Sequence, residues 1–456
     1  MSLYNWTGNP FVDSGISAIM VFSNKSSPEE INIDDLQQMR SHLLCLYTSE
    51  MWIKVLNMIF TTNYYVTRPK ANTIDKKLKG LTEFLDSLMG NIKPLGDAGD
   101  CIACGRRNTA QMKNRMHIPM LGYKHSHYFP YISEGADICD ACSFAVQCSP
   151  LVMYRCGAKL ILLHSNSTKV MKVWANRAKE FIMKDKSSKT FSGCYNDNYK
   201  NPENALFHIV QDLILRYDES WKENNTTLRI YHFTNFTQLP PDALKIYDLP
   251  APVFRFLAQA MQKSFRKDWF KIVRRGYYNI EGKKEEEYRN YNNQVYSRLL
   301  RYRSIIHYFV DSSKKIIHGN WELLEIYLTE VLFMDKERIE AIKKLADKIA
   351  EIIRTKSNGK KRLFQLEQAQ KYTSFRNVLL LLMHDSITAK AESPLFTFDE
   401  YVDKLFPASS LEWKETQDLV LFRIYEKLHD WLISQDIIVE ETESEETSEI
   451  NSKTEE

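Results

Sequence analysis

The sequence predicts an α+β protein, with a mixed N-terminal region that contains a four-cysteine module and a C-terminal antiparallel helical bundle. Three observations support this fold class. Two Cys-x-x-Cys pairs lie in the first third of the chain, and short β-branched runs alternate with helical patterns up to about residue 250. From Asp335 onward, apolar residues recur every three or four positions almost throughout, which predicts amphipathic helices joined by short loops.

Composition divides the chain into five predicted segments. The 456 residues are enough for about three domains. Paired prolines at 240–241 and at 250 and 252 favour extended backbone, which places one boundary near residue 250. Residues 440–456 contain 8 Glu and one Lys, a composition typical of disorder. The segments are a helical and loop region (1–95), an α/β region with the cysteine module (96–250), a basic, aromatic-rich region (251–333), the helical bundle (334–435) and a disordered acidic tail (436–456).

Residues 5–15 combine turn-forming residues with two large aromatics, and we interpret them as a rigid loop. Gly8 and Gly15 would permit close approach of another backbone. The alternative is an N-terminal turn that places Trp6 and Phe11 in the core.

The elements that follow are predicted from periodicity. Helical spacing indicates one helix or a broken pair over residues 34–60, and another helix over 76–89 that Gly90 ends. Apolar, β-branched runs predict buried strands at 158–163 and 228–233. Helices are expected at 170–183 and 203–215. The first bundle helix opens at residues 334–337, where an acidic residue suits the positive end of the helix dipole.

The strongest chemical signal is the two cysteine pairs, Cys101 with Cys104 and Cys139 with Cys142. Two thiolates separated by two residues can lie on one tight turn and reach the same tetrahedral ion, and Gly105 suits the left-handed backbone of such a turn. Sulfur ligands favour zinc over harder ions, so we predict a zinc module with all four thiolates as ligands. A closed four-sulfur site has no position for water, and its role would be structural.

Two other interpretations of these cysteines stay open. The 34-residue loop between the pairs is longer than in the usual zinc ribbons, so the pairs could be unrelated. A redox site is the other possibility, although a reactive pair is expected singly beside a thioredoxin-like strand and helix.

The sequence favours a cytoplasmic protein without a membrane partner. No apolar run approaches the length of a membrane span, and the first residues lack the charged start and apolar stretch of a signal peptide.

The run Thr7-Gly8-Asn9-Pro10-Phe11-Val12-Asp13, followed by the two cysteine pairs, resembles the CXXC-CXXC family of CRISPR-associated proteins, the large subunit of type I-B Cascade surveillance complexes. The resemblance covers roughly the first third of the chain. It implies a non-catalytic subunit that lies at the 5′ end of the guide RNA and checks the short motif that flanks a target. It also implies partners: guide RNA, target DNA, other Cascade subunits and a helicase-nuclease recruited on target binding.

Cations and aromatics suggest where nucleic acid would bind. Residues 260–320 contain 14 Lys or Arg and 6 acids, interleaved with Tyr and Trp. Cations neutralise phosphates and aromatic faces accept unpaired bases, whereas Asn and Arg can also read base edges. Solvated helix faces and an aromatic core are the alternatives. The candidates are Asn9; Arg106, Arg107, Lys113, Arg115 and Lys124 in the module; Arg266, Lys267, Lys271, Arg274, Arg275, Arg298, Arg301 and Arg303 in the basic region; and Lys343, Lys344, Lys360, Lys361 and Arg362 in the bundle.

The sequence favours a binding protein over an enzyme. It contains no Walker loop, nucleophile motif or acidic cluster with metal-ligand spacing. The alternative is a zinc-scaffolded nuclease or DNA-modifying enzyme in which His125 and His127 supply the chemistry. A free-standing transcription regulator is a second alternative. In the complexes that this chain resembles, a small subunit can also be translated from within the large-subunit gene, so we expect the bundle to be made separately from Met334.

Overall fold

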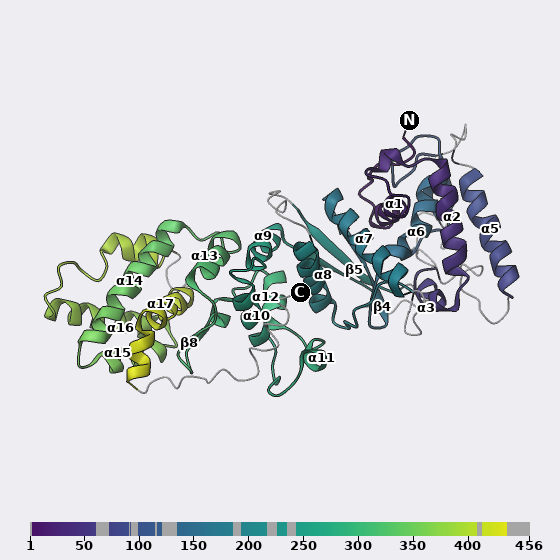
Figure 1. Ribbon diagram of the computed structural model, residues 1–456. Coiled ribbons are helices and arrows are strands. Elements are labelled where there is room, and N and C mark those ends of the chain that lie inside the picture. The colour runs from purple at the N-terminus through teal and green to yellow at the C-terminus, as the bar shows by residue number, and fades with distance from the viewer. Residues whose placement is uncertain are drawn as a thin grey trace, which may run out of the picture. The chain divides into compact units, whose positions relative to one another are not determined.

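The computed structural model describes residues 2–60, 73–90, 92, 99–114, 116–120, 135–185, 193–216, 226–234, 243–407 and 413–435 (Figure 1). The chain forms two compact units, Met1–Ala251 and Pro252–Glu456. The described part is mostly helical with small antiparallel sheets, and its C-terminal helices pack together, which confirms the predicted fold class. The predicted acidic tail lies outside the described residues. No helix in the described ranges is long and apolar enough to cross a membrane.

The first unit is built around helix α1 (Pro10–Phe22). Its residues from Val12 to Phe22 are all buried, because this stretch contains almost only apolar and small residues and can be covered on every side. The helices around it are α2 (Ile33–Tyr47), α3 (Glu50–Ile59), α5 (Ile74–Gly90), α6 (Asp140–Cys148), α7 (Thr168–Asp185) and α8 (Pro202–Arg216). Helices α2 and α5 lie side by side in Figure 1, where Arg40 pairs with Asp86 at 2.5 Å.

Two antiparallel sheets complete this unit. The small sheet pairs β1 (Ala110–Lys113) with β2 (Ala136–Cys139), with Ala110 opposite Cys139. The larger sheet has the order β3-β4-β5-β6. Its strands are β3 (Tyr154–Cys156), β4 (Lys159–Ser165), β5 (Leu228–Phe233) and β6 (Leu244–Leu249). Strands β4 and β5 correspond to the two runs predicted as strands, and α7 and α8 to the two helices predicted in this region.

The N-terminal prediction needs correction. Residues 10–15 are the start of α1 and not part of a loop, because Asn9 caps this helix and a proline follows it at the first helical position. Gly8 has a φ of +79° and open space around its Cα, so it provides a left-handed turn and not a close contact. Trp6 is half-buried, and the ring of Phe11 meets that of Phe233 edge-on at 5.5 Å.

The second unit contains the basic region and the bundle. Its first elements are α9 (Ala251–Ala260), α10 (Arg266–Arg275), α11 (Glu285–Tyr288), α12 (Gln294–Leu300), the 3₁₀ turn η4 (Ile306–Tyr308), and the short strands β7 (Val310–Asp311) and β8 (Ile316–Ile317). The helices α13 (Trp321–Glu330), α14 (Lys336–Thr355), α15 (Gly359–Glu367), α16 (Tyr372–Thr388) and α17 (Trp413–Ser434) follow. A π-helical turn, Glu400–Leu405, precedes α17.

Contacts cross the boundary predicted at residue 334. Asp335 caps α14, as an acidic residue at this helix end should. Met334 itself is buried, and Trp321 of α13 packs edge-on against Phe422 of α17 at 5.7 Å. Lys315 pairs with Glu367 of α15 at 3.2 Å. The bundle and the elements before it therefore share one core, and a separate domain from residue 334 stays a prediction.

Candidate metal centre and N-terminal loop

The four predicted cysteines come together at the start of α6. Cys101 and Cys104 lie on a turn in which Gly105 donates a backbone hydrogen bond to the Cys101 carbonyl at 2.8 Å. Gly105 has a φ of +69°, the left-handed conformation expected for it. Cys139 ends β2 and stands at the N-cap of α6, and Cys142 lies in the first turn of that helix. The pairing of β1 with β2 and the start of α6 thus place Cys139 and Cys142 beside Cys101 and Cys104.

The sulfur geometry fits a tetrahedral metal ion. The four Sγ atoms all lie within 4.8 Å of one another. Four sulfurs at about 2.3 Å from a tetrahedral zinc would be about 3.8 Å apart. The Sγ atoms of Cys104 and Cys139 are 3.8 Å apart, and the backbone N–H of Cys139 donates to the Cys101 sulfur at 3.3 Å. Such an N–H···S contact would orient a thiolate ligand and reduce its charge.

The thiols strongly affect one another's ionisation. Hydrogen bonds from the other three lower the pKa of Cys101 well below its usual range, whereas bonding to Cys101 and Cys104 raises the pKa values of Cys139 and Cys142. Sulfurs this close and this buried cannot all carry a negative charge unless a cation lies between them. The positive end of α6 and a metal ion would both favour the thiolate form. The donor set therefore fits a structural metal of the zinc type.

Around this centre, the module matches one known family. Residues 96–154 match the model of the Cas_CXXC_CXXC family, described as CRISPR-associated protein. The Cas_CXXC_CXXC segment contains both cysteine pairs, both strands of the small sheet and helix α6. No curated protein matches the chain. The family that the motifs suggested is thus supported over this segment.

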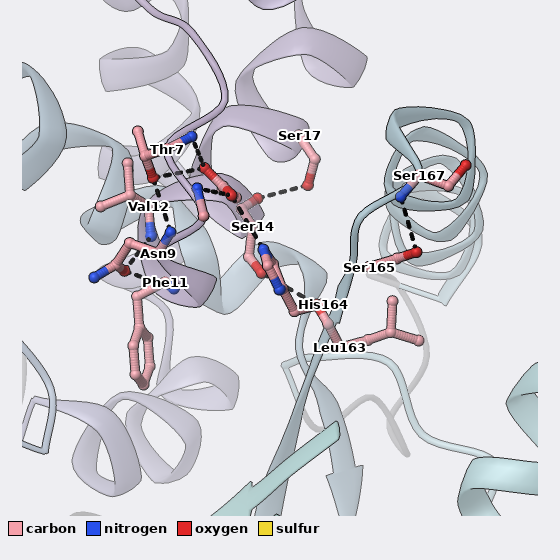
Figure 2. A network of polar contacts seen from close by, with 12 residues as sticks. Thr7, Asn9, Phe11, Val12, Ser14, Ser17, Leu163, His164, Ser165 and Ser167 are labelled. Atoms are coloured by element: carbon pink, nitrogen blue, oxygen red, sulfur yellow. Dashed lines mark hydrogen bonds and ion pairs between the residues drawn. The ribbon is translucent and has the colours of Figure 1, made fainter. Parts of the chain in front are cut away.

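The Thr7–Asp13 segment forms a polar network with His164, and Figure 2 shows Thr7 and His164 on either side of it. The network is centred on the Asp13 carboxylate. Thr7 donates to it from its backbone N–H and its hydroxyl, both at 2.8 Å, and the Gly8 N–H donates at 2.9 Å. The ring Nε2 of His164 on β4 lies 3.0 Å from Oδ2, the carboxylate oxygen that also accepts from Gly8. Asn9 accepts hydrogen bonds through Oδ1 from the backbone N–H groups of residues 11 and 12. Residues 7–9 thus form a capping turn that folds back on the first turn of α1, and Asp13 connects this turn to the larger sheet through His164.

Several of the candidate nucleic-acid ligands are occupied by internal contacts. Lys113 is buried and forms an ion pair with Asp140, and Arg362 pairs with Asp385 at 2.6 Å. Arg275 donates to the Tyr308 carbonyl at 2.6 Å. Internal carbonyls accept from Arg106, Arg266, Arg298 and Arg301, while Lys343 pairs with Glu340 and Arg274 lies over the ring of Tyr288.

Other candidates face solvent. Lys267 and Lys271 are half-buried. The fully exposed candidates are Arg107, Arg301, Arg303, Lys344, Lys360 and Lys361. Arg115, Lys124, His125 and His127 lie outside the described residues. Nucleic-acid contact stays a prediction for every candidate. Among the exposed ones, Arg301 already donates to the Ser297 carbonyl at 3.3 Å, so a phosphate would have to bind its other N–H groups or replace this contact.

Tertiary packing separates the exposed from the buried aromatics of the basic region, and it places beside His307 a cation that the sequence did not single out. Tyr278 and Tyr302 are 64% and 65% exposed, in contrast to the buried aromatics Trp269 and Tyr288. Loss of solvation, the larger cause, and the nearby cations Arg298, Arg275 and Lys414 together lower the pKa of His307 to about 4. Lys414 comes from α17, more than a hundred positions along the chain, so no local pattern could have revealed its place beside His307.

Proposed function

We propose that this chain is a non-catalytic, nucleic-acid-binding subunit of a CRISPR-associated complex, namely the large subunit of a type I-B Cascade complex, with zinc in its four-cysteine centre. The observation that carries the proposal is the family match over a module whose sulfurs have the spacing of a tetrahedral zinc site. Four sulfur ligands close the coordination sphere, so the metal holds the module together and does not activate water.

The second unit supplies a surface suited to single-stranded nucleic acid. We call it the Arg298–His307 surface and define it as Tyr278, Arg298, Arg301, Tyr302, Arg303 and His307. Its two exposed tyrosines can stack on bases, and its arginines can neutralise phosphates. In RNA-guided complexes, base pairing reads the target sequence, whereas protein holds the displaced strand and reads the flanking motif. We assign the first of these protein roles to the Arg298–His307 surface.

The N-terminal loop and the metal module would serve the second role. Arg107 is exposed beside the metal centre, and Arg can bond two acceptors on guanine. Asn9 uses its side-chain oxygen to cap α1, so base contact from Asn9 would come through its amide nitrogen. In this proposal Asn9 and Arg107 lie near the guide's 5′ end and the duplex that bears the flanking motif. A helicase-nuclease would be recruited after target binding.

A salt titration tests the assignment of the Arg298–His307 surface. The affinity of the assembled complex for target DNA is measured at increasing salt for the unmodified chain and for Arg301→Gln/Arg303→Gln. Each lost phosphate contact should reduce the slope of log affinity against log salt by about 0.7 on a single strand. The control, Arg376→Gln/Lys427→Gln, removes two exposed cations from α16 and α17 in the same unit.

An unchanged slope in Arg301→Gln/Arg303→Gln, or an equal loss in the control, would contradict the assignment. Sequence preference should stay the same, because phosphate contacts carry no base information. DNA cleavage by the purified chain with added metal would instead favour the alternative of a nuclease scaffolded by zinc.

A further inference from the structure

The metal centre and the Thr7–Asp13 loop are joined by two direct contacts. The guanidinium of Arg106, two residues after Cys104, donates to the Leu3 carbonyl at 2.6 Å. The hydroxyl of Tyr4 donates to the carbonyl of Ala141 at 2.8 Å, and Ala141 immediately precedes Cys142. Both contacts thus join Leu3 or Tyr4, which precede the Thr7–Asp13 segment, to a residue next to the four cysteines.

Both contacts are well placed to transmit order. Tyr4 is 2% exposed, and burial raises the pKa of its phenol well above the usual range, so it is a fixed neutral donor. The backbone of Arg106 belongs to the cysteine turn, because its carbonyl accepts from the Cys101 N–H at 2.9 Å. A metal ion that fixes the turn would therefore also fix the base of the Arg106 side chain.

A third connection runs through the helices that follow each site. Helix α1 begins at Pro10, within the Thr7–Asp13 segment, and α6 begins at Asp140, directly after its N-cap Cys139. They cross where a Cβ on Gly15 would lie only 1.7 Å from the Ala145 carbonyl oxygen. At such a close approach of backbones, a shift in the first turn of α6 cannot be absorbed by side chains alone.

We propose that Arg106 and Tyr4 are positioning residues that couple metal binding to the order of the Thr7–Asp13 loop. The sequence predicts Arg106 as a nucleic-acid ligand, but in the structure its guanidinium donates to the protein's own backbone at Leu3. With metal bound, the cysteine turn and the first turn of α6 hold Leu3 and Tyr4, which keeps the Thr7 and Gly8 amides against Asp13. Without metal, the four thiols separate, both anchors loosen and the loop exchanges its amides with solvent.

Hydrogen–deuterium exchange on the full chain measures this directly. The proposal rests on the metal assignment above, so zinc content is determined first by elemental analysis. Exchange is then followed in the peptide containing residues 7–12 for the zinc-loaded and the chelated protein. Removing zinc should speed this exchange by about tenfold or more, the factor that corresponds to losing one hydrogen bond to a charged group.

Point variants separate coupling from general unfolding. Arg106→Ala and Tyr4→Phe, each with zinc still bound, should speed exchange in residues 7–12 while leaving β4 and β5 protected. Arg107→Ala is the matched control, because this neighbouring arginine is exposed and has no hydrogen-bond partner among the described residues. It should change nothing in the loop.

Three results are decisive. If the chain contains no zinc or other metal, the metal assignment itself fails. If it binds zinc but chelation leaves exchange in residues 7–12 slow, the coupling is refuted although the metal site stands. Equal exchange in Tyr4→Phe, Arg107→Ala and the unmodified chain would also refute it, and this comparison does not depend on whether Arg106→Ala folds.

Discussion

Asp13 shows how a single side chain organises the N-terminal loop. Its two carboxylate oxygens accept hydrogen bonds from the backbone N–H groups of Thr7 and Gly8 and lie beside His164. Asp13 is buried, so without this carboxylate several polar groups would lack a hydrogen-bond partner. Charged acceptors make stronger hydrogen bonds than neutral ones. The conformation of residues 7–9 therefore depends more on the negative charge of Asp13 than on the turn-forming residues of this segment.

Replacing Asp13 by Asn tests this dependence. The amide keeps the shape but has one acceptor oxygen in place of two, so at least one donor loses its partner. We expect Asp13→Asn to lower the free energy of unfolding by about 2 kcal/mol, measured by urea denaturation. Asp34→Asn, at an exposed position in the first turn of α2, serves as control. A loss in Asp13→Asn no larger than in the control would show that the carboxylate is not the centre of the loop.

His307 makes stability depend on pH. Its pKa is lowered to about 4 in the folded protein and is about 6.5 when unfolded, so between these values the unfolded chain binds the proton more readily. The folded state should therefore lose stability as pH falls from 6.5 to 4. His307→Gln removes this loss, so urea denaturation at pH 7 and pH 5 should show the variant gaining on the unmodified chain at the lower pH. If His307→Gln and the exposed control His429→Gln behave alike, the pKa of His307 is not lowered in the folded protein.

For single residues, the sequence identified the four cysteines that come together but not the partners of the cations. The four cysteines carry their spacing in the sequence, and the two-residue separation alone is enough to place each pair on one turn. The contacts of Lys113 and Arg362 depend on Asp140 and Asp385, which only tertiary packing brings close. Composition cannot distinguish such an internal ion pair from a solvent-facing cation.

At the scale of elements, periodicity located most helices and strands but failed at α1. This helix is apolar or small on all sides, so it has no amphipathic pattern to reveal it, and its start is rich in turn-forming residues. The helical spacing over residues 34–60 predicts either one helix or a broken pair, and the structure has a break between α2 and α3. Residues with weak helical preference at Thr48 and Ser49 are where the structure places it.

The crossing of α1 and α6 gives an element-scale prediction. An alanine at Gly15 would force the two helices apart, since its Cβ would overlap the Ala145 carbonyl. We expect Gly15→Ala to cost about 3 kcal/mol or more, read as a lower urea midpoint. Gly90→Ala, at the end of α5 with nothing within 4 Å, should be neutral or slightly stabilising. Equal effects of the two substitutions would contradict this packing.

At the scale of the whole molecule, the second unit does not divide cleanly at Met334. The packing of Trp321 on Phe422 and the pair between Lys315 and Glu367 would both be lost in a product that starts there. We still expect such a product if the chain is a large subunit of this kind, with its exposed core face covered by neighbouring subunits. Expression of the C-terminally tagged gene should give a short band that Met334→Leu abolishes. If the unmodified gene gives no short band, the separate product does not exist.

We propose that this chain belongs to an RNA-guided complex, and the RNA that accompanies it in the cell tests this proposal. The tagged protein is purified from its own cells and the bound RNA is sequenced. We expect the chain to purify with other protein subunits and with RNAs that share one constant 5′ segment followed by variable guide sequences, as base-pairing guides must. A chain that purifies without RNA, or with a random sample of cellular RNA, would contradict it.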